Sequence, residues 1–177
     1  MQSLITVFLV AVGLSMDAFS LAVIYGTLSL SKKRIILLSG IVGVFHFFMP
    51  LLGNILGSLI SNIIKINLDI VVGLILIAIA VEMIISLFKN EEVKSLVGLS
   101  SLLLFGFTVS IDSFSVGIGL SVLYSNVLLS VIIFSFVSFL FTFIGLLIGK
   151  KLSDIFGYIA TTIGSIILLV LGIGYIF

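Results

Sequence analysis

Six long apolar stretches separated by short polar breaks make up almost the whole chain. Each stretch is about as long as the roughly 20 residues that an α-helix needs to cross a bilayer, and none alternates with the two-residue period of a strand. A backbone inside lipid must satisfy its own hydrogen bonds, so each stretch is predicted to be a transmembrane α-helix. The six predicted spans are Leu4–Leu28, Ile35–Ile60, Leu68–Phe88, Leu96–Leu123, Val127–Gly149 and Ile155–Phe177.

The breaks between the spans differ in their basic residues. The breaks after the first, third and fifth spans hold Lys32, Lys33, Arg34, Lys89, Lys94, Lys150 and Lys151, whereas the opposite side holds only Lys65. Because Lys and Arg accumulate in cytoplasmic loops, both termini are predicted to lie outside the cell. No linker divides the chain, so residues 1–177 are expected to form a single all-α membrane domain.

Composition excludes several classes of protein. Only 8% of the 177 residues are charged, against about 25% in soluble domains, and 62% are hydrophobic. A net charge of +1 does not indicate a nucleic-acid partner, and the absence of cysteine removes thiolate metal sites. No nucleophile–base constellation, cofactor motif or Gly-Lys-Ser/Thr loop is present, so neither an enzyme nor an ATP-driven pump is expected. The first stretch is read as a retained span, since it lacks a basic n-region and a cleavage site.

Two aspartates interrupt this apolar sequence near the middle of the first and fourth spans. Asp17 and Asp112 lie in similar six-residue windows, Ser15–Ser20 and Ser110–Ser115, which agree at Ser, Asp, Phe and Ser. An ionisable side chain at the bilayer centre costs about 2.5–3.5 kcal/mol on insertion scales. The same cost in two similar windows indicates a duplicated polar site.

The similarity between the two halves extends to glycines. The pattern Gly53-x3-Gly57 in the second span matches Gly145-x3-Gly149 in the fifth. Such patterns also serve helix packing alone, which is the simpler explanation of the glycines by themselves. Three spans per half would place the second copy upside down, so residues 1–88 and 96–177 are predicted to be inverted three-helix repeats. This is the architecture of many secondary transporters, which bind substrate near the midplane.

The residues around the aspartates favour a cation. Ser20 and Ser115 each follow an aspartate by three positions, so each pair shares a helix face. Two facing carboxylates repel unless a cation lies between them, and hard divalent ions such as Mn²⁺ or Mg²⁺ favour oxygen ligands. Alternatively, each aspartate only bonds nearby hydroxyls or caps a broken helix.

Two further residues are candidate ligands. His46, the only histidine, precedes Pro50 by four positions, and a proline there removes a backbone hydrogen bond and predicts a kink. Imidazole can bind Mn²⁺ or take part in a proton step, although His46 could equally be a packing residue. Glu82 in the third span could receive an arriving cation, or extend to the interface or pair with Lys89.

Three motifs carry a resemblance to a known family. They are Ser-Met-Asp-Ala-Phe in the first span, Ser-Ile-Asp-Ser-Phe-Ser-Val-Gly-Ile-Gly in the fourth, and Met-Pro-Leu-Leu-Gly at 49–53. Together with the six spans, they resemble the MntP family of manganese efflux pumps, in the wider LysE-like superfamily. The chain departs from the family pattern at Tyr25, at His46 and at the start of the last span. The resemblance implies a prokaryotic plasma-membrane exporter with Asp17 and Asp112 at the transport site.

The residues and the resemblance together predict a secondary transporter that exports Mn²⁺ as its substrate, without a resident cofactor. Coupling to protons is a hypothesis from the chemistry of the carboxylates. One rival is an exporter of a small organic solute such as an amino acid, although no Arg or Lys lies within a span to meet a substrate carboxylate. Another rival is a non-transporting, sporulation-type membrane protein, which would leave the two aspartates unexplained.

Overall fold

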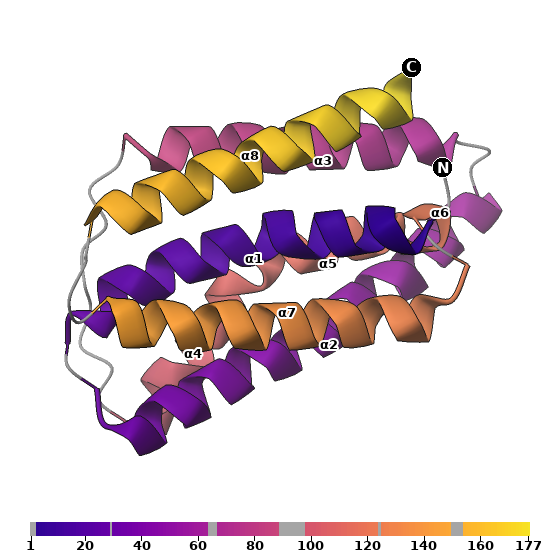
Figure 1. The fold of residues 1–177 in the computed structure, drawn as a ribbon. Coiled ribbons are helices and arrows are strands. Elements are labelled where there is room, and N and C mark those ends of the chain that lie inside the picture. Colours follow the sequence, from indigo (N-terminus) through magenta and orange to yellow (C-terminus); the bar gives the residue numbers. More distant parts are fainter. Residues whose placement is uncertain (1–2, 29, 64–66, 89–97, 124, 150–153) are drawn as a thin grey trace.

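The computed structural model describes residues 3–28, 30–63, 67–88, 98–123, 125–149 and 154–177, and these ranges contain helices and no strand (Figure 1). Six of its helical segments are long and apolar enough to cross a membrane, which confirms the all-α class and the six spans. The helices are α1 (Leu4–Gly26), α2 (Lys32–Ile63), α3 (Leu68–Ser86), α4 (Leu99–Val109), α5 (Ile111–Ile118), α6 (Leu120–Leu123), α7 (Val127–Ile148) and α8 (Asp154–Ile176).

Polar side chains cap the N-terminal ends of three of the helices. The Ser3 hydroxyl accepts a hydrogen bond from the Thr6 amide at the start of α1, at 3.1 Å. Asn67 and Asn126 cap α3 and α7 in the same way. These side chains satisfy amides that the first helical turn leaves without a backbone partner.

The fourth span is interrupted, whereas the sequence predicted one helix over Leu96–Leu123. The interruptions fall at Ser110, between α4 and α5, and at Gly119, between α5 and α6. The Ser110 hydroxyl donates to the carbonyls of Gly106 and Phe107, at 2.8 and 3.1 Å, and the Ser110 amide bonds back only three residues to Phe107. A serine that bonds the preceding turn competes with regular helix geometry, which explains the break next to Asp112. Residues 96 and 97 lie outside the described ranges.

Each helix of the first half packs mainly against helices of the second half. α1 contacts α7 and α8, α2 contacts α7, α5 and α4, and α3 contacts α8. Figure 1 shows α1 beside α7 and α3 beside α8. The two halves therefore form one intermingled bundle.

Matching glycines make matching contacts in the two halves. A Cβ added at Gly145 would lie 2.8 Å from the carbonyl oxygen of Phe19, and one added at Gly53 would overlap the carbonyl oxygen of Phe114. Phe19 and Phe114 both follow an aspartate by two positions. The α1–α7 crossing thus repeats the geometry of the α5–α2 crossing.

The next glycine along each helix repeats the correspondence. A Cβ at Gly149 would overlap the carbonyl oxygen of Val23, and a Cβ at Gly57 would overlap that of Ile118. Val23 and Ile118 both follow an aspartate by six positions. Such contacts are those expected of the predicted inverted repeats, whose two-fold relation stays a prediction.

Two clusters of buried apolar residues fill the bundle and meet partway along α1 and α7, while on α3 the first cluster runs from Val72 to Met83. The terminal-side cluster joins α1, α3, α5, α6, α7 and α8 and includes Val10, Leu14, Leu76, Val116 and Leu120. The basic-side cluster joins α1, α2, α4 and α7 and includes Ala18, Leu38, Val42, Val109 and Leu146. The names refer to the side of the bundle with the chain termini and the side where α2 begins at Lys32.

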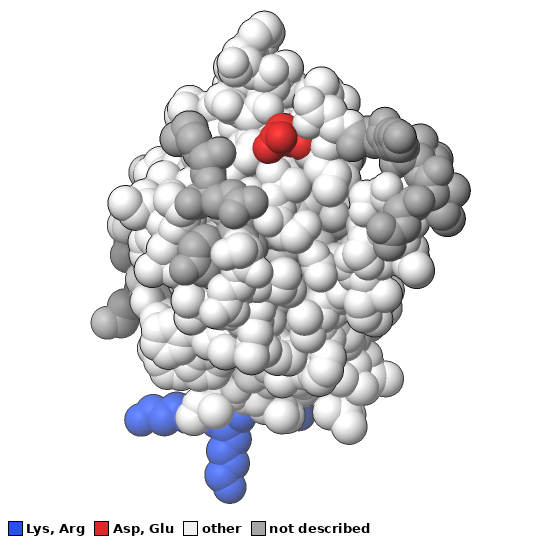
Figure 2. All heavy atoms as spheres, turned by 90° about the vertical axis from the view of Figure 1, so that its right-hand side faces the viewer, with Lys and Arg blue, Asp and Glu red and all other residues white. Residues whose placement is uncertain are grey.

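Both termini lie on one side of the bundle, and the start of α2 lies on the other (Figure 1). Seen from the side of the termini, the surface is mostly uncharged, and basic side chains project only at its lower edge (Figure 2). Among the described residues, Lys and Arg occur only at Lys32, Lys33 and Arg34. This distribution matches the predicted asymmetry, while the assignment of the basic side to the cytoplasm stays a prediction.

We expect Gly57→Ala to destabilise the protein by about 1–3 kcal/mol, because the new methyl group would overlap the backbone of Ile118. Thermal unfolding in detergent measures the effect. Gly40→Ala on the same helix is the control, since nothing lies within 4 Å of its added Cβ. Equal melting temperatures for the two variants would contradict the close crossing of α2 and α5.

Single cysteines at Ser31 and Asn126 test the orientation in a chain with no cysteine of its own. Both positions are exposed. In intact cells, an impermeant thiol reagent should label Asn126→Cys and leave Ser31→Cys unlabelled until the membrane is permeabilised. The reverse pattern would place the termini in the cytoplasm.

Candidate functional site

Asp17 lies on α1 at the boundary between the two apolar clusters. Leu14, three residues before it, belongs to the terminal-side cluster, and Ala18 directly after it belongs to the basic-side cluster. The side chain is half-buried. Asp17 shares a helix face with Val10 and Leu14, which both pack into the terminal-side cluster.

Asp112 occupies the equivalent boundary on α5. Val109, three residues before it, belongs to the basic-side cluster, and Val116, four residues after it, belongs to the terminal-side cluster. Asp112 is also half-buried, and it lies in the first turn of α5. Each aspartate therefore lies at the boundary between the two clusters along its own span.

Buried polar side chains accompany the aspartates in the sequence. Ser15, Ser110 and Ser113 have no exposed surface, and His46 is 1% exposed. Ser113 donates to the Ser110 carbonyl, at 2.6 Å, so its hydroxyl is satisfied within the interrupted span. We call Asp17, Asp112 and these neighbours the mid-depth polar layer, because each lies near the middle of its span along the chain; that they form one site at the midplane stays a prediction.

A hydrogen bond links α1 to α7 within this layer. The hydroxyls of Ser15 and Ser138 lie 2.9 Å apart and are both buried. Ser15 precedes Asp17 by two positions, which is about 200° around an α-helix. The hydrogen bond therefore holds one face of α1 against α7, while Asp17 projects from the opposite face.

His46 is buried on α2, and its Nδ1 donates to the carbonyl of Val42 at 3.0 Å. This bond assigns the proton to Nδ1, since a carbonyl only accepts. In the neutral ring, Nε2 is then the atom with a lone pair for a cation. α2 continues as a helix through Pro50, whose backbone packs closely against Gly117 of α5.

The two serines predicted to help bind the ion differ in what the structure shows of them. Ser20 packs against Gly157 of α8, where an added Cβ would lie 3.0 Å from the Ser20 hydroxyl oxygen. Ser115 is half-buried on α5. Their joint participation in one cation site stays a prediction.

Glu82 is exposed on α3. α3 contacts α5, the helix that carries Asp112. Lys89, its alternative partner, lies outside the described residues. Glu82 thus places a further carboxyl group on a helix that neighbours α5.

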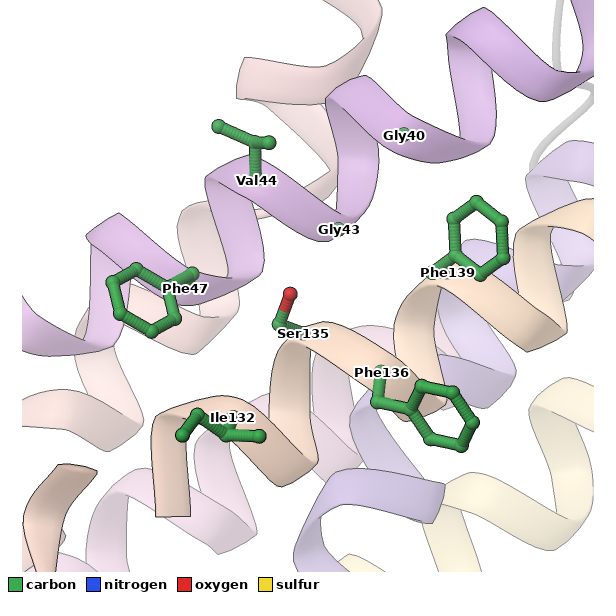
Figure 3. A pocket seen from close by; sticks show the side chains of 8 residues that line it. All are labelled: Gly40, Gly43, Val44, Phe47, Ile132, Ser135, Phe136 and Phe139. Atoms are coloured by element: carbon green, nitrogen blue, oxygen red, sulfur yellow. The ribbon is translucent and has the colours of Figure 1, made fainter. Parts of the chain in front are cut away.

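The structure does not assemble a complete metal-binding cluster. Among the described residues, no group of three or more His, Cys, Asp or Glu side chains is placed to hold a metal ion. A groove of about 310 Å³ lies instead between α2 and α7, lined by Gly40, Gly43, Val44, Phe47, Ile132, Ser135, Phe136 and Phe139 (Figure 3). Ser135 is its only lining residue with a polar side chain, so this groove lacks the carboxylates that a divalent cation needs.

Sequence reasoning identified the aspartates but missed the partner of Ser15 and the polar residues of α7. Ser138 and Thr142 lie one turn apart on that helix, and both are buried. A weak signal was present, because Ser15 and Ser110 occupy equivalent positions in the two aspartate windows. The helix that faces Ser15 could not be deduced from that similarity.

Comparison with known proteins identifies similar chains over nearly the full length. Residues 29–176 match the family model described as "Putative manganese efflux pump". A "Putative manganese efflux pump MntP" of Bacillus pumilus (strain SAFR-032) is 35% identical over 98% of this chain and 95% of its own length. A protein of the same name from Bacillus cereus (strain B4264) is 34% identical over 99% of this chain and 97% of its own. No solved structure matches significantly.

Proposed function

The chain belongs to the family of manganese efflux pumps, and from this premise we propose that it exports a divalent cation, Mn²⁺, through the mid-depth polar layer. The relatives carry this activity in their names, and the present chain covers nearly all of their length. The proposed location is the plasma membrane of a prokaryote, with both termini outside.

The position of the two aspartates carries the proposal. Each half-buried carboxylate lies where the terminal-side and basic-side clusters meet. A charged group at this depth is costly in a bilayer, and such residues mark ion pathways in membrane proteins. Two carboxylates would compensate the charge of one divalent cation and supply the oxygen ligands that Mn²⁺ accepts.

We assign the ligands as follows. Asp17 and Asp112 bind the cation directly, and their carboxylate oxygens approach within about 4 Å of each other, twice a typical Mg²⁺–oxygen distance. Ser20 and Ser115 add hydroxyl oxygens, and His46 contributes Nε2.

Export proceeds in this proposal by alternating access. Mn²⁺ arrives from the cytoplasm past Glu82, displaces protons from Asp17 and Asp112, and is held at mid-depth. The bundle then opens outward, where protons return to the carboxylates and weaken the site. Glu82 suits the first step because it is exposed on α3, which contacts the helix that carries Asp112.

Asp17→Asn and Asp112→Asn should each lower manganese export at least about tenfold, because a neutral amide replaces a charged ligand of similar size. Metal resistance of cells and efflux from loaded vesicles measure the loss. Asp69→Asn, an exposed carboxylate in the first turn of α3, is the matched control and should export normally. Wild-type export by either site variant at normal expression would refute the shared site.

Whole-cell elemental analysis tests the identity of the cargo. Under manganese stress, cells without the protein should accumulate manganese, and cells that express it should return to the basal content. Unchanged manganese with an altered content of another metal would overturn the choice of ion. No change in any metal would instead favour an organic solute or a role without transport.

A further inference from the structure

The contact between α1 and α7 consists of small residues along both helices. A Cβ added at Gly145 would lie 2.8 Å from the Cβ of Ala22, and one at Gly149 would lie 3.0 Å from the Cα of Gly26. The hydroxyl pair of Ser15 and Ser138 belongs to the same line of contacts. In each of these pairs the two positions differ by 123, so the two helices run in parallel with a constant register.

Thr142 lies one turn beyond Ser138 on the same face of α7, and its hydroxyl is unusual. The residue has no exposed surface, and among the described residues its Oγ1 is the buried side-chain oxygen or nitrogen without a hydrogen-bond partner. Other hydroxyls in these helices, such as those of Ser130 and Thr162, donate to the carbonyl four residues earlier. A buried hydroxyl without a hydrogen-bond partner destabilises the conformation that contains it. A second conformation that gives the Thr142 hydroxyl a partner would remove this cost.

A shift of α1 by one helical turn toward the basic side would supply that partner. Ser15 would leave Ser138 and meet Thr142, four positions further along α7. The same shift would place Ala18 against Gly145 and Ala22 against Gly149. Ala22 would then occupy the place of Gly26, where a Cβ would lie 2.7 Å from the carbonyl oxygen of Leu146, so α1 and α7 would have to separate slightly at this point. The interface therefore repeats itself after one turn, with a hydroxyl partner for Ser15 in both registers.

The other neighbours of α1 lie on α8 and in the terminal-side cluster. α1 meets α8 at Gly157 and Gly164, which present no side chain to Ser20 and Met16. It also meets α8 at Gly13, over which the buried side chain of Leu168 is packed, so Leu168 would have to move when the shift brings Leu9 to that place. Its opposite face contributes apolar residues such as Leu14 to the terminal-side cluster, where attraction is not directional. One-turn shifts of a packed element are an established kind of conformational switch.

We infer that Thr142 is the second hydrogen-bond partner of Ser15, so that Ser15, Ser138 and Thr142 position Asp17 at two depths of the membrane. Four residues of an α-helix correspond to about 6 Å along its axis. The shift would carry Asp17 by that distance toward the side of Lys32–Arg34, the predicted cytoplasmic side. The existence of the two registers does not depend on which solute the protein transports. Their role in moving Mn²⁺ rests on the proposed function.

Cysteine pairs test the two registers in membranes that contain the full chain. Ser15→Cys should form a disulfide with Ser138→Cys and, in a separate variant, with Thr142→Cys, since a bond needs Cα atoms within about 7 Å. Ser15→Cys with Ser130→Cys, two turns away on α7, is the control and should stay reduced. A disulfide with Ser138→Cys but none with Thr142→Cys would overturn the second register, whichever solute the protein exports.

Export by the disulfide-linked Ser15→Cys/Ser138→Cys protein provides a second test of the two registers. The disulfide fixes one register, so manganese efflux should stop on oxidation and return on reduction. Undiminished efflux from the fully linked protein would contradict the inference. If the registers belong to the export cycle, Mn²⁺ added to the membranes should also change the yield of the Ser15–Ser138 disulfide relative to that of the Ser15–Thr142 disulfide, each measured in its own cysteine variant.

The variant Thr142→Val tests whether the Thr142 hydroxyl positions α1 during export or is only an unsatisfied buried group. The substitution keeps the shape and removes the hydroxyl, so the melting temperature should stay unchanged or rise. Efflux should nevertheless fall about tenfold, and Thr142→Ser should restore it, because serine retains the donor. Ser130→Ala is the control on the same helix and should export normally. Normal efflux by Thr142→Val would refute the role of Thr142 even if the cysteine variants failed to fold.

Discussion

Close backbone contact at two helix crossings is the constraint on which the rest of the structure depends. α1 meets α7 at Gly145 and Gly149, and α2 meets α5 at Gly53, where an added Cβ would collide with a neighbouring backbone. Inside a bilayer, where lipid is as apolar as the helices, such packing is a main source of helix association. Because Phe19 and Phe114 face these crossings, the aspartates two positions before them project from other faces of their helices.

The two halves are similar in packing but different in chemistry. α1 continues as one helix past Asp17, whereas the span that contains Asp112 is interrupted at Ser110. With Gly53 aligned to Gly145, His46 of α2 corresponds to Ser138 of α7. One half thus has a buried imidazole where the other has a hydroxyl bonded to Ser15.

The features that could be predicted from sequence are those that the bilayer imposes on every residue of a span. Length and hydropathy were sufficient for the six spans, and the cost of a buried charge was sufficient to single out Asp17 and Asp112. The interruption at Ser110 was missed because it results from a local competition between a hydroxyl and the backbone. The Ser15–Ser138 pair was missed because apolar periodicity identifies a buried face without identifying the helix that covers it.

An anomalous difference map at the manganese absorption edge, from crystals grown with Mn²⁺, would test the account most directly. The account predicts one strong peak at mid-depth, within coordination distance of both the Asp17 and the Asp112 carboxylates, and no such peak in Asp17→Asn. A peak that lies beside Glu82 alone, or that survives the loss of the Asp17 carboxylate unchanged, would contradict it.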